Sequence, residues 1–297
     1  MDINKRLIDP RSPDRRPRRA AYALPSLFTA GNIFFGYVAV IQSFQGAMAA
    51  VTGAGSAAAH FEIAAKMIGI AAVLDGLDGR IARMTNTVSD FGREMDSLAD
   101  VIAFGIAPAV LAFAWGVRFV DMSGLAGLPE YLPKAGYFVC FLFTLCGAAR
   151  LARFNVTTNP IPRNPGRPDR KYFVGLPIPA GAALVAAVVF AAGSEPLQWW
   201  PFSVAWLILL TILSLLMVSM WRYPSFKDMS LLKPRSPLTI IFIASMIYLI
   251  WVAAQPVLLA LAVLYVGSGI ATRAGGILRR HMRRAPNPNP KPEQQIG

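Results

Sequence analysis

The stretch "DGLDGRIARMTNTVSDFGREMDSLAD", residues 75–100, places four carboxylates inside or against apolar segments of the chain. They are Asp75, Asp78, Asp96 and Asp100. By insertion scales, one charged side chain at the centre of a membrane helix costs roughly 3 kcal/mol. Four of them in two neighbouring segments therefore indicate a functional site, with a ligand or partner that compensates the cost.

The rest of the chain is strongly apolar. Of its 297 residues, 55% are hydrophobic and only 15% are charged, whereas about 25% are charged in an ordinary soluble domain. A run of about 20 apolar residues is long enough to cross a bilayer as a helix. Such runs predict helices at 23–48, 60–83, 95–117, 134–154, 173–193, 198–220, 236–254 and 256–272. The sequence therefore predicts an all-α polytopic membrane protein with about eight transmembrane helices.

The basic residues predict the orientation of these helices. All but three of the 29 Lys and Arg residues fall in the two tails or in alternate loops, the exceptions being Lys66, Arg118 and Lys134. Cytoplasmic loops carry the Lys/Arg excess, so we expect both termini, and the carboxylates, on the cytoplasmic side. A net charge of +13 spread in this way also attracts anionic membrane lipid. No nucleic-acid partner is expected, because no basic domain with interleaved aromatic residues is present.

The composition also divides the chain into segments. We expect a basic disordered cytoplasmic tail at 1–22 and a core of six helices at 23–220. Two additional transmembrane helices are expected at 221–272, followed by a basic, Pro-rich cytoplasmic tail at 273–297.

The spacing of the carboxylates predicts that they converge. Asp75 and Asp78 are three residues apart at the end of the second predicted helix, and Asp96 and Asp100 are four apart at the start of the third. Each pair therefore lies on one helical face. Four converging carboxylates repel one another unless a hard divalent cation, which prefers oxygen ligands, binds between them. We expect two ions, Mg²⁺ or Mn²⁺, because a two-metal site suits displacement at phosphorus.

Small residues line the same helical faces. Gly79 and Ala82 continue the face of the first carboxylate pair, and Gly92 lies one turn before the second pair. They leave room for a bulky ligand to approach the backbone. Arg83 supplies a cation that can pair with a phosphate.

Polar residues of two other predicted helices are further candidates. Thr29 and Asn32, in the first helix, can face a nucleotide, or can hydrogen-bond between helices instead. Arg150 and Arg153, at the end of the fourth helix, can clamp a carboxylate or a phosphate. The alternative is that both arginines are topological anchors at the cytoplasmic surface. Asn155 is a further polar contact just beyond them.

The spacing Asp-x2-Asp-Gly-x2-Ala-Arg-x8-Gly-x3-Asp-x3-Asp over residues 75–100 resembles the signature of the CDP-alcohol phosphotransferase family at every fixed position. The resemblance implies an enzyme that moves a phosphatidyl group from CDP-diacylglycerol to an alcohol and releases CMP. It implies that the four aspartates hold two divalent metals, with Asp100 also acting as the catalytic base. It places Gly79, Ala82 and Arg83 near the CDP moiety, and it implies a homodimer.

Four further stretches resemble the membrane-embedded phosphatidylserine synthases within that family. They are "LPSLFTAGNIFFGY" (24–37), "DSLADVIAFGIAPA" (96–109), "ARLARFN" (149–155) and "VGLPIPAGAA" (174–183). This likeness implies L-serine as the acceptor. From the distribution of Lys and Arg, we expect the active site on the cytoplasmic side of the membrane, which we expect to be a bacterial inner membrane.

Three alternatives stay open at the level of sequence. A sister transferase would use glycerol 3-phosphate, inositol phosphate or choline as the acceptor. The carboxylates could instead form ion pairs with Arg80, Arg83 and Arg93. They could also be the cation-binding groups of a transporter, although a transporter more often shows interrupted helices at mid-membrane depth.

Overall fold

The computed structural model describes residues 15–85, 90–121, 128–158, 172–224 and 237–283. At several segment ends, residues 78–85 among them, it describes the backbone but not the side chains. Its helices are α1 (Arg15–Thr52), α2 (Ala57–Thr85), α3 (Asp90–Asp100), the π-helix η2 (Val101–Ile106), α4 (Ala107–Gly116), α5 (Leu128–Thr158), α6 (Ile178–Ala191), α7 (Trp200–Val218), α8 (Pro237–Val252) and α9 (Ala254–Arg283). Two short strands, β1 (Tyr172–Val174) and β2 (Arg222–Pro224), pair in antiparallel fashion. The expectation of an all-α fold is confirmed, with this small ribbon added.

The helices confirm an integral membrane protein. In the described part of the chain, six helices are long and apolar enough to cross a membrane. Two further apolar segments, Ile178–Ala191 and Ile243–Val252, are shorter than a full span. The outer surface is apolar as well: Phe34, Tyr37 and Phe44 of α1 are each about 60% exposed. A surface of this kind suits contact with lipid tails, which do not penalise exposed apolar side chains.

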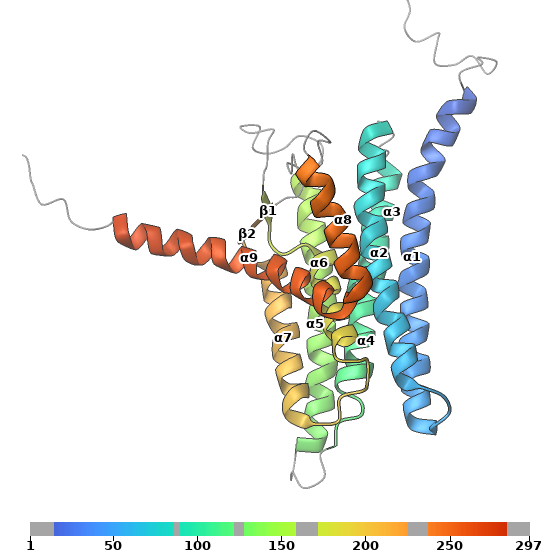
Figure 1. Cartoon of the computed structure of the whole chain (residues 1–297), viewed down its shortest axis with the longest axis vertical. Coiled ribbons are helices and arrows are strands. Elements are labelled where there is room, and N and C mark those ends of the chain that lie inside the picture. Colours follow the sequence, from blue (N-terminus) through green and yellow to red (C-terminus); the bar gives the residue numbers. More distant parts are fainter. Residues whose placement is uncertain (1–14, 86–89, 122–127, 159–171, 225–236, 284–297) are drawn as a thin grey trace, which may run out of the picture.

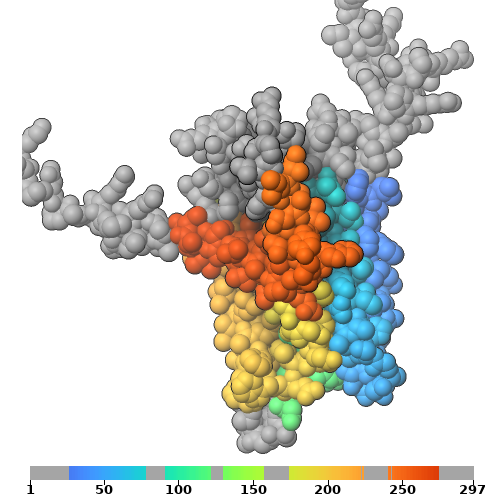
Figure 2. All heavy atoms as spheres, viewed as in Figure 1, coloured from blue at the N-terminus to red at the C-terminus, as the bar shows by residue number. Residues whose placement is uncertain are grey.

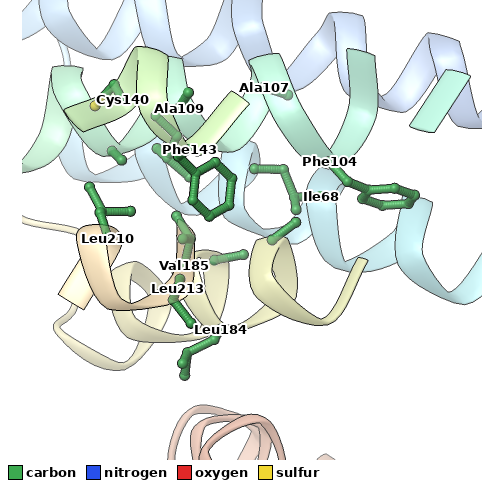
Figure 3. Close-up of a cluster of buried hydrophobic side chains, with 14 of the residues drawn as sticks. Ile68, Phe104, Ala107, Ala109, Cys140, Phe143, Leu184, Val185, Leu210 and Leu213 are labelled. Carbon is green, nitrogen blue, oxygen red and sulfur yellow. The ribbon is translucent and has the colours of Figure 1, made fainter. Parts of the chain in front are cut away.

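The helices pack around a buried centre to which α5, α6 and α7 contribute. Figure 3 shows Phe143 of α5 close to Val185 of α6 and Leu213 of α7, and all three are fully buried. In lipid, burial of apolar surface supplies little drive between helices, so close packing of such side chains is what stabilises the bundle. This packing fixes α5, the helix that carries Arg150.

The third predicted helix, expected to be continuous over 95–117, contains a π-helical turn. This turn, η2, follows Asp100 directly and leads into α4. Helix α1 approaches it closely, because a Cβ on Gly36 would lie only 2.7 Å from the Cα of Ala103. The Thr144 hydroxyl of α5 donates a hydrogen bond to the Gly105 carbonyl at 3.2 Å. The irregular turn is therefore held from both sides.

The fifth predicted helix begins later than expected. It was expected from residue 173, but α6 starts at Ile178 after Pro177, whose ψ of 136° is not helical. Gly175, with a φ of +79°, turns the chain between β1 and α6. A Cβ there would also lie 2.4 Å from the Met217 carbonyl oxygen, so only glycine fits. The Pro and Gly residues of this segment therefore oppose helix formation.

The first and the last helix along the chain, α1 and α9, extend into segments expected to be disordered tails. Helix α1 begins at Arg15, within the expected tail 1–22, and α9 continues to Arg283, within the expected tail 273–297. Arg and Ala near the start of α1, and Arg, Ile and Leu near the end of α9, are compatible with helix and extend it. Residues 1–14 and 284–297 lie outside the described residues.

The last two helices are arranged differently from the rest. Figure 1 shows α9 running across the bundle, whereas α1, α2, α5 and α7 run along it. In Figure 2, α8 and α9 cover part of the face of the molecule turned toward the viewer. The division of the chain into a six-helix core and two additional transmembrane helices stays a prediction.

Candidate metal and substrate site

Three carboxylates from two helices converge at one point. Asp75 of α2 and Asp96 and Asp100 of α3 each place a carboxylate oxygen within 4.8 Å of the other two. Helices α2 and α3 both pack against α1, and the four-residue spacing in α3 puts its two aspartates on one face. The predicted convergence is therefore present for these three. The side chain of Asp78 lies outside the described residues.

Arg150 of α5 lies beside this cluster. Its side chain is buried, with 8% exposed, and it interacts electrostatically with Asp100 and Asp75. Its Nε has no hydrogen-bond partner among the described residues. An arginine with an unsatisfied donor next to a polar cluster is suited to bind a carboxylate or phosphate.

Arg153, one turn further along α5, is used differently. Its guanidinium donates hydrogen bonds to the carbonyl oxygens of Val218 at 3.0 Å and of Ser219 and Val174 at 3.4 Å. These bonds join α5 to the end of α7 and to β1. A role for Arg153 as a substrate ligand stays a prediction.

Asn155 connects α5 with α3. Its side-chain amide donates to the Ser97 hydroxyl at 2.9 Å, and Ser97 in turn donates to the Arg93 carbonyl at 3.0 Å. Since Ser97 lies between Asp96 and Asp100, this contact holds the helix that presents both aspartates. Direct contact of Asn155 with a substrate stays a prediction.

The two polar residues of α1 are buried. Thr29 is 8% exposed and Asn32 is fully buried. Neither polar atom of the Asn32 side chain has a hydrogen-bond partner among the described residues. The neighbouring Gly31 faces Leu74, the residue before Asp75, at 3.7 Å from its notional Cβ. Asn32 is thus a buried amide without a hydrogen-bond partner among the described residues, one residue from the contact between α1 and Leu74. Contact of Thr29 or Asn32 with a nucleotide stays a prediction.

The remaining predicted residues are described less completely. Gly92 lies half-buried in α3, one turn before Asp96. The helix α2 includes positions 79, 82 and 83, but the surroundings of Gly79 and the side chains of Ala82 and Arg83 lie outside the described part of the structure. Their predicted positions near the CDP moiety therefore stay predictions.

Sequence reasoning missed one residue near the site, Tyr265 of α9. Its side chain interacts electrostatically with Arg150, and its ring centroid lies 6.1 Å from that of Tyr223 of β2. The segment 256–272 looks like an ordinary apolar span in sequence, so no local pattern could have linked it to the carboxylates.

A comparison with protein-family models matches residues 22–209 to the CDP-alcohol phosphatidyltransferase family. The chain belongs to this family. The resemblance expected from the spacing at residues 75–100 is therefore confirmed. The matched region contains the three converging carboxylates, Arg150 and Asn32, and it ends within α7.

Several proteins with known names are similar to this chain in sequence. A CDP-diacylglycerol–serine O-phosphatidyltransferase of Helicobacter pylori is 38% identical over 214 residues, which cover 71% of this chain and 76% of the relative. One from Saccharomyces cerevisiae is 41% identical over 132 residues, or 44% of this chain and 41% of the relative. An archaetidylserine synthase of Methanothermobacter thermautotrophicus is 32% identical over 204 residues, covering 68% and 70%.

The residues of the cluster fit a divalent cation. They offer carboxylate oxygens, the donors that hard cations prefer, and one of these, Asp96 Oδ1, is buried without a hydrogen-bond partner among the described residues. Three carboxylates this close also repel one another, with Arg150 providing partial compensation. The CDP-alcohol phosphatidyltransferase family depends in general on divalent metals, which agrees with this donor set.

Proposed function

We propose that this protein transfers the phosphatidyl group of CDP-diacylglycerol to the hydroxyl of L-serine, which gives phosphatidylserine and CMP. The observation that carries the proposal is the convergence of Asp75, Asp96 and Asp100 beside Arg150. This arrangement occurs in a chain that aligns over most of its length with a relative named for that reaction. The carboxylates account for the chemistry at phosphorus, and the arginine accounts for an acceptor that carries a carboxylate.

Asp75, Asp78, Asp96 and Asp100 would hold two divalent cations, Mg²⁺ or Mn²⁺. When bound, such ions neutralise the charge of the pyrophosphate and of the departing phosphate. Asn32, whose amide is buried and unsatisfied among the described residues, would hydrogen-bond the donor together with Thr29. Gly79, Ala82, Arg83 and Gly92 would line the CDP moiety.

Asp100 is the proposed general base. A serine hydroxyl holds its proton too tightly to be a good nucleophile at neutral pH, so a carboxylate must accept the proton as the new bond forms. The serine oxygen bonds to the phosphorus that carries the diacylglycerol, and the bond from that phosphorus to the CMP oxygen breaks. Arg150 meanwhile binds the carboxylate of serine. A single displacement inverts the configuration at phosphorus, and net retention would exclude it.

The position of the site suits one lipid and one water-soluble substrate. Asp75 lies close to the end of the apolar segment Ala57–Leu77, so the cluster lies toward one end of the membrane spans. The acyl chains of the donor can stay in lipid there, while serine enters and CMP leaves through water. From the distribution of Lys and Arg we propose that this end is cytoplasmic, in a bacterial inner membrane. We also propose that the protein works as a homodimer.

CMP release tests the function directly. The purified protein would be incubated in detergent–lipid micelles with CDP-diacylglycerol, Mg²⁺ or Mn²⁺, and one alcohol at a time. We expect release with L-serine, its loss with EDTA, and its return when the cation is added back. Release with glycerol 3-phosphate, inositol phosphate or choline instead would keep the carboxylate chemistry and overturn the choice of acceptor. No release with any alcohol would overturn the enzymatic role.

A further inference from the structure

Helix α5 is joined to α3 by a hydrogen bond between two neutral side chains. The amide of Asn155 donates to the Ser97 hydroxyl at 2.9 Å, and that hydroxyl donates to the Arg93 carbonyl at 3.0 Å. Both side chains are half-buried, so water competes with the bond less than it would on an exposed surface. The bond connects two positions 58 residues apart in the chain. It therefore ties the end of α5 to the helix that presents Asp96 and Asp100.

A second contact ties α5 to the same segment beyond Asp100. There the chain passes into the π-helical turn η2, and the Thr144 hydroxyl donates to the Gly105 carbonyl at 3.2 Å. Ser97 lies three residues before Asp100, and Gly105 lies five residues after it. Since residue 155 contacts residue 97 and residue 144 contacts residue 105, α5 runs antiparallel to this segment. Helix α5 thus holds the chain on both sides of Asp100.

Ser97 is well placed to control the two aspartates of α3. It follows Asp96 directly, and Asp100 is three residues further on, on the neighbouring part of the helix surface. A rotation of α3 about its axis would move the Ser97 hydroxyl and both carboxylates together. The bond to Asn155 therefore opposes any rotation that would change the position of the two carboxylates relative to Asp75 of α2.

The carboxylate cluster needs a support of this kind. Its three carboxylates lie within 4.8 Å of one another, so in their ionised form they repel, and the repulsion favours movements that separate α2 from α3. A basic side chain could oppose this separation, but it would also compete with a cation for the carboxylate oxygens. The neutral amide and hydroxyl hold α3 and leave the negative charge of the cluster to the cation.

We propose that Ser97 and Asn155 are positioning residues, which set the cation affinity of the carboxylate cluster by fixing the orientation of α3. The inference rests on one part of the proposed function, namely that the cluster binds a divalent cation. The two residues act through Asp96 and Asp100, and the bonds made and broken at phosphorus do not involve them. Loss of the bond between them should weaken cation binding and leave the chemical step intact once the cation is bound.

Mn²⁺ binding to the full-length protein tests the proposal. The purified protein is treated with EDTA, exchanged into metal-free detergent–lipid micelles and titrated with Mn²⁺, and the unbound ion is measured by its electron paramagnetic resonance signal. We expect Ser97→Ala and Asn155→Leu each to raise the Kd about tenfold, the lower range for loss of a group that orients metal ligands. The double variant should raise the Kd no further than the larger single change, because all three proteins lack the same bond.

Two further variants serve as controls. Ser97→Thr keeps the hydroxyl, so its Kd should stay within about twofold of the wild-type value. Ser214→Ala is the matched control, because the Ser214 hydroxyl also donates to a carbonyl four residues earlier, that of Leu210, at 2.8 Å. It lies on α7, which carries none of the three aspartates. Its Mn²⁺ affinity should equal that of the wild type.

The dependence of CMP release on Mn²⁺ concentration provides a second measurement. In Ser97→Ala the concentration for half-maximal release should rise by the same factor as the Kd, and kcat at saturating Mn²⁺ should stay within about threefold of the wild-type value. A purely structural defect would lower kcat without this shift. Since neither constant depends on the amount of folded protein, a partly misfolded preparation cannot imitate the result.

Three outcomes would overturn the inference and leave the proposed function intact. They are an unchanged Kd in both single variants, additive increases in the double variant, and an equal increase in Ser214→Ala. A raised serine KM in Asn155→Leu at unchanged Kd would also overturn it and would place Asn155 in the acceptor site. Wild-type protein that binds no Mn²⁺ would overturn both the inference and the metal-binding role of the cluster.

Discussion

Helix α2 carries charged residues in two places, and their surroundings differ. Near its start, Lys66 forms an ion pair with Glu62 on the preceding turn, and both side chains are about half exposed. Near its other end, the carboxylate of Asp75 lies close to those of Asp96 and Asp100 of α3. Asp75 also interacts electrostatically with Arg150 of α5. The ion pair of the first group lies within one helix, and Lys66 Nζ also lies 5.4 Å from the ring centroid of Phe190 on α6. The second depends on three helices and contains buried atoms, Asp96 Oδ1 and Arg150 Nε, that have no hydrogen-bond partner among the described residues. This difference separates a local ion pair from a candidate binding site.

The strongest test of this comparison is Asp100→Asn. The change keeps the size of the side chain but removes both the proposed proton acceptor and one cation ligand. We expect serine-dependent CMP release to fall at least about a hundredfold, the lower range for loss of a general base. Membrane insertion and the elution profile in detergent should stay unchanged. Turnover near the wild-type rate with normal metal dependence would refute the role of Asp100.

Arg150→Gln tests the cation that borders the cluster. A charged hydrogen-bond donor to a substrate contributes about 1.5–3 kcal/mol, so kcat/KM for serine should fall roughly 10- to 100-fold. Arg150→Lys retains the charge but not the planar fork, and should recover only part of the loss. Equal activity of all three proteins would show that Arg150 serves the fold alone.

Arg153→Gln separates the two arginines of α5. Since the Arg153 guanidinium donates to carbonyls of Val218, Ser219 and Val174, its loss should lower the thermal midpoint of unfolding. A loss of about 1–3 kcal/mol of stability is expected from bonds of this type. The serine KM of the folded protein should stay within about threefold of the wild-type value. A large rise in KM at unchanged stability would instead place Arg153 in the acceptor site.

The smallest effect is expected at the other end of α2. In the double variant Glu62→Gln, Lys66→Gln, both members of a half-exposed pair become neutral, so neither is left as an uncompensated charge. Pairs of this type contribute about 0–1 kcal/mol. Activity and the thermal midpoint should both match the wild type within error. Loss of activity here would break the distinction between the two ends of the helix.

The sequence predicted the parts of the molecule that depend on local pattern. A helix lies in each segment where an apolar helix was expected, although six rather than eight of the described helical stretches are long enough to cross a membrane. Asp75, Asp96 and Asp100 converge as their spacing indicates. The ribbon β1–β2 was not predicted, because it pairs two three-residue segments about 50 residues apart and neither has room for an alternating pattern. Tyr265 was missed for a related reason: its proximity to Arg150 is set by the course of α9 across the bundle.

The different contacts of Arg150 and Arg153 could not be predicted from the sequence either. Both follow the same "ARLARFN" pattern at the end of α5, and both read as cytoplasmic arginines. Their surroundings differ because the ends of α7 and β1 present carbonyl oxygens to Arg153, whereas α2 and α3 present carboxylates to Arg150. Such a difference depends on which elements pack nearby, and the spacing within one helix does not contain it.

The π-helical turn Val101–Ile106 has a consequence for changes in chain length. A π-helical turn closes hydrogen bonds over five residues where an α-helical turn closes them over four, so η2 accommodates one residue more than the regular path. Deletion of one residue within it would therefore leave the directions in which Asp100 and Trp115 point from the helix unchanged relative to each other. Deletion of one residue in α4 would instead rotate the two ends by about 100° relative to each other. In the continuous helical segment α3–η2–α4, η2 is thus a place where one residue can be lost while the side chains on either side keep their relative directions.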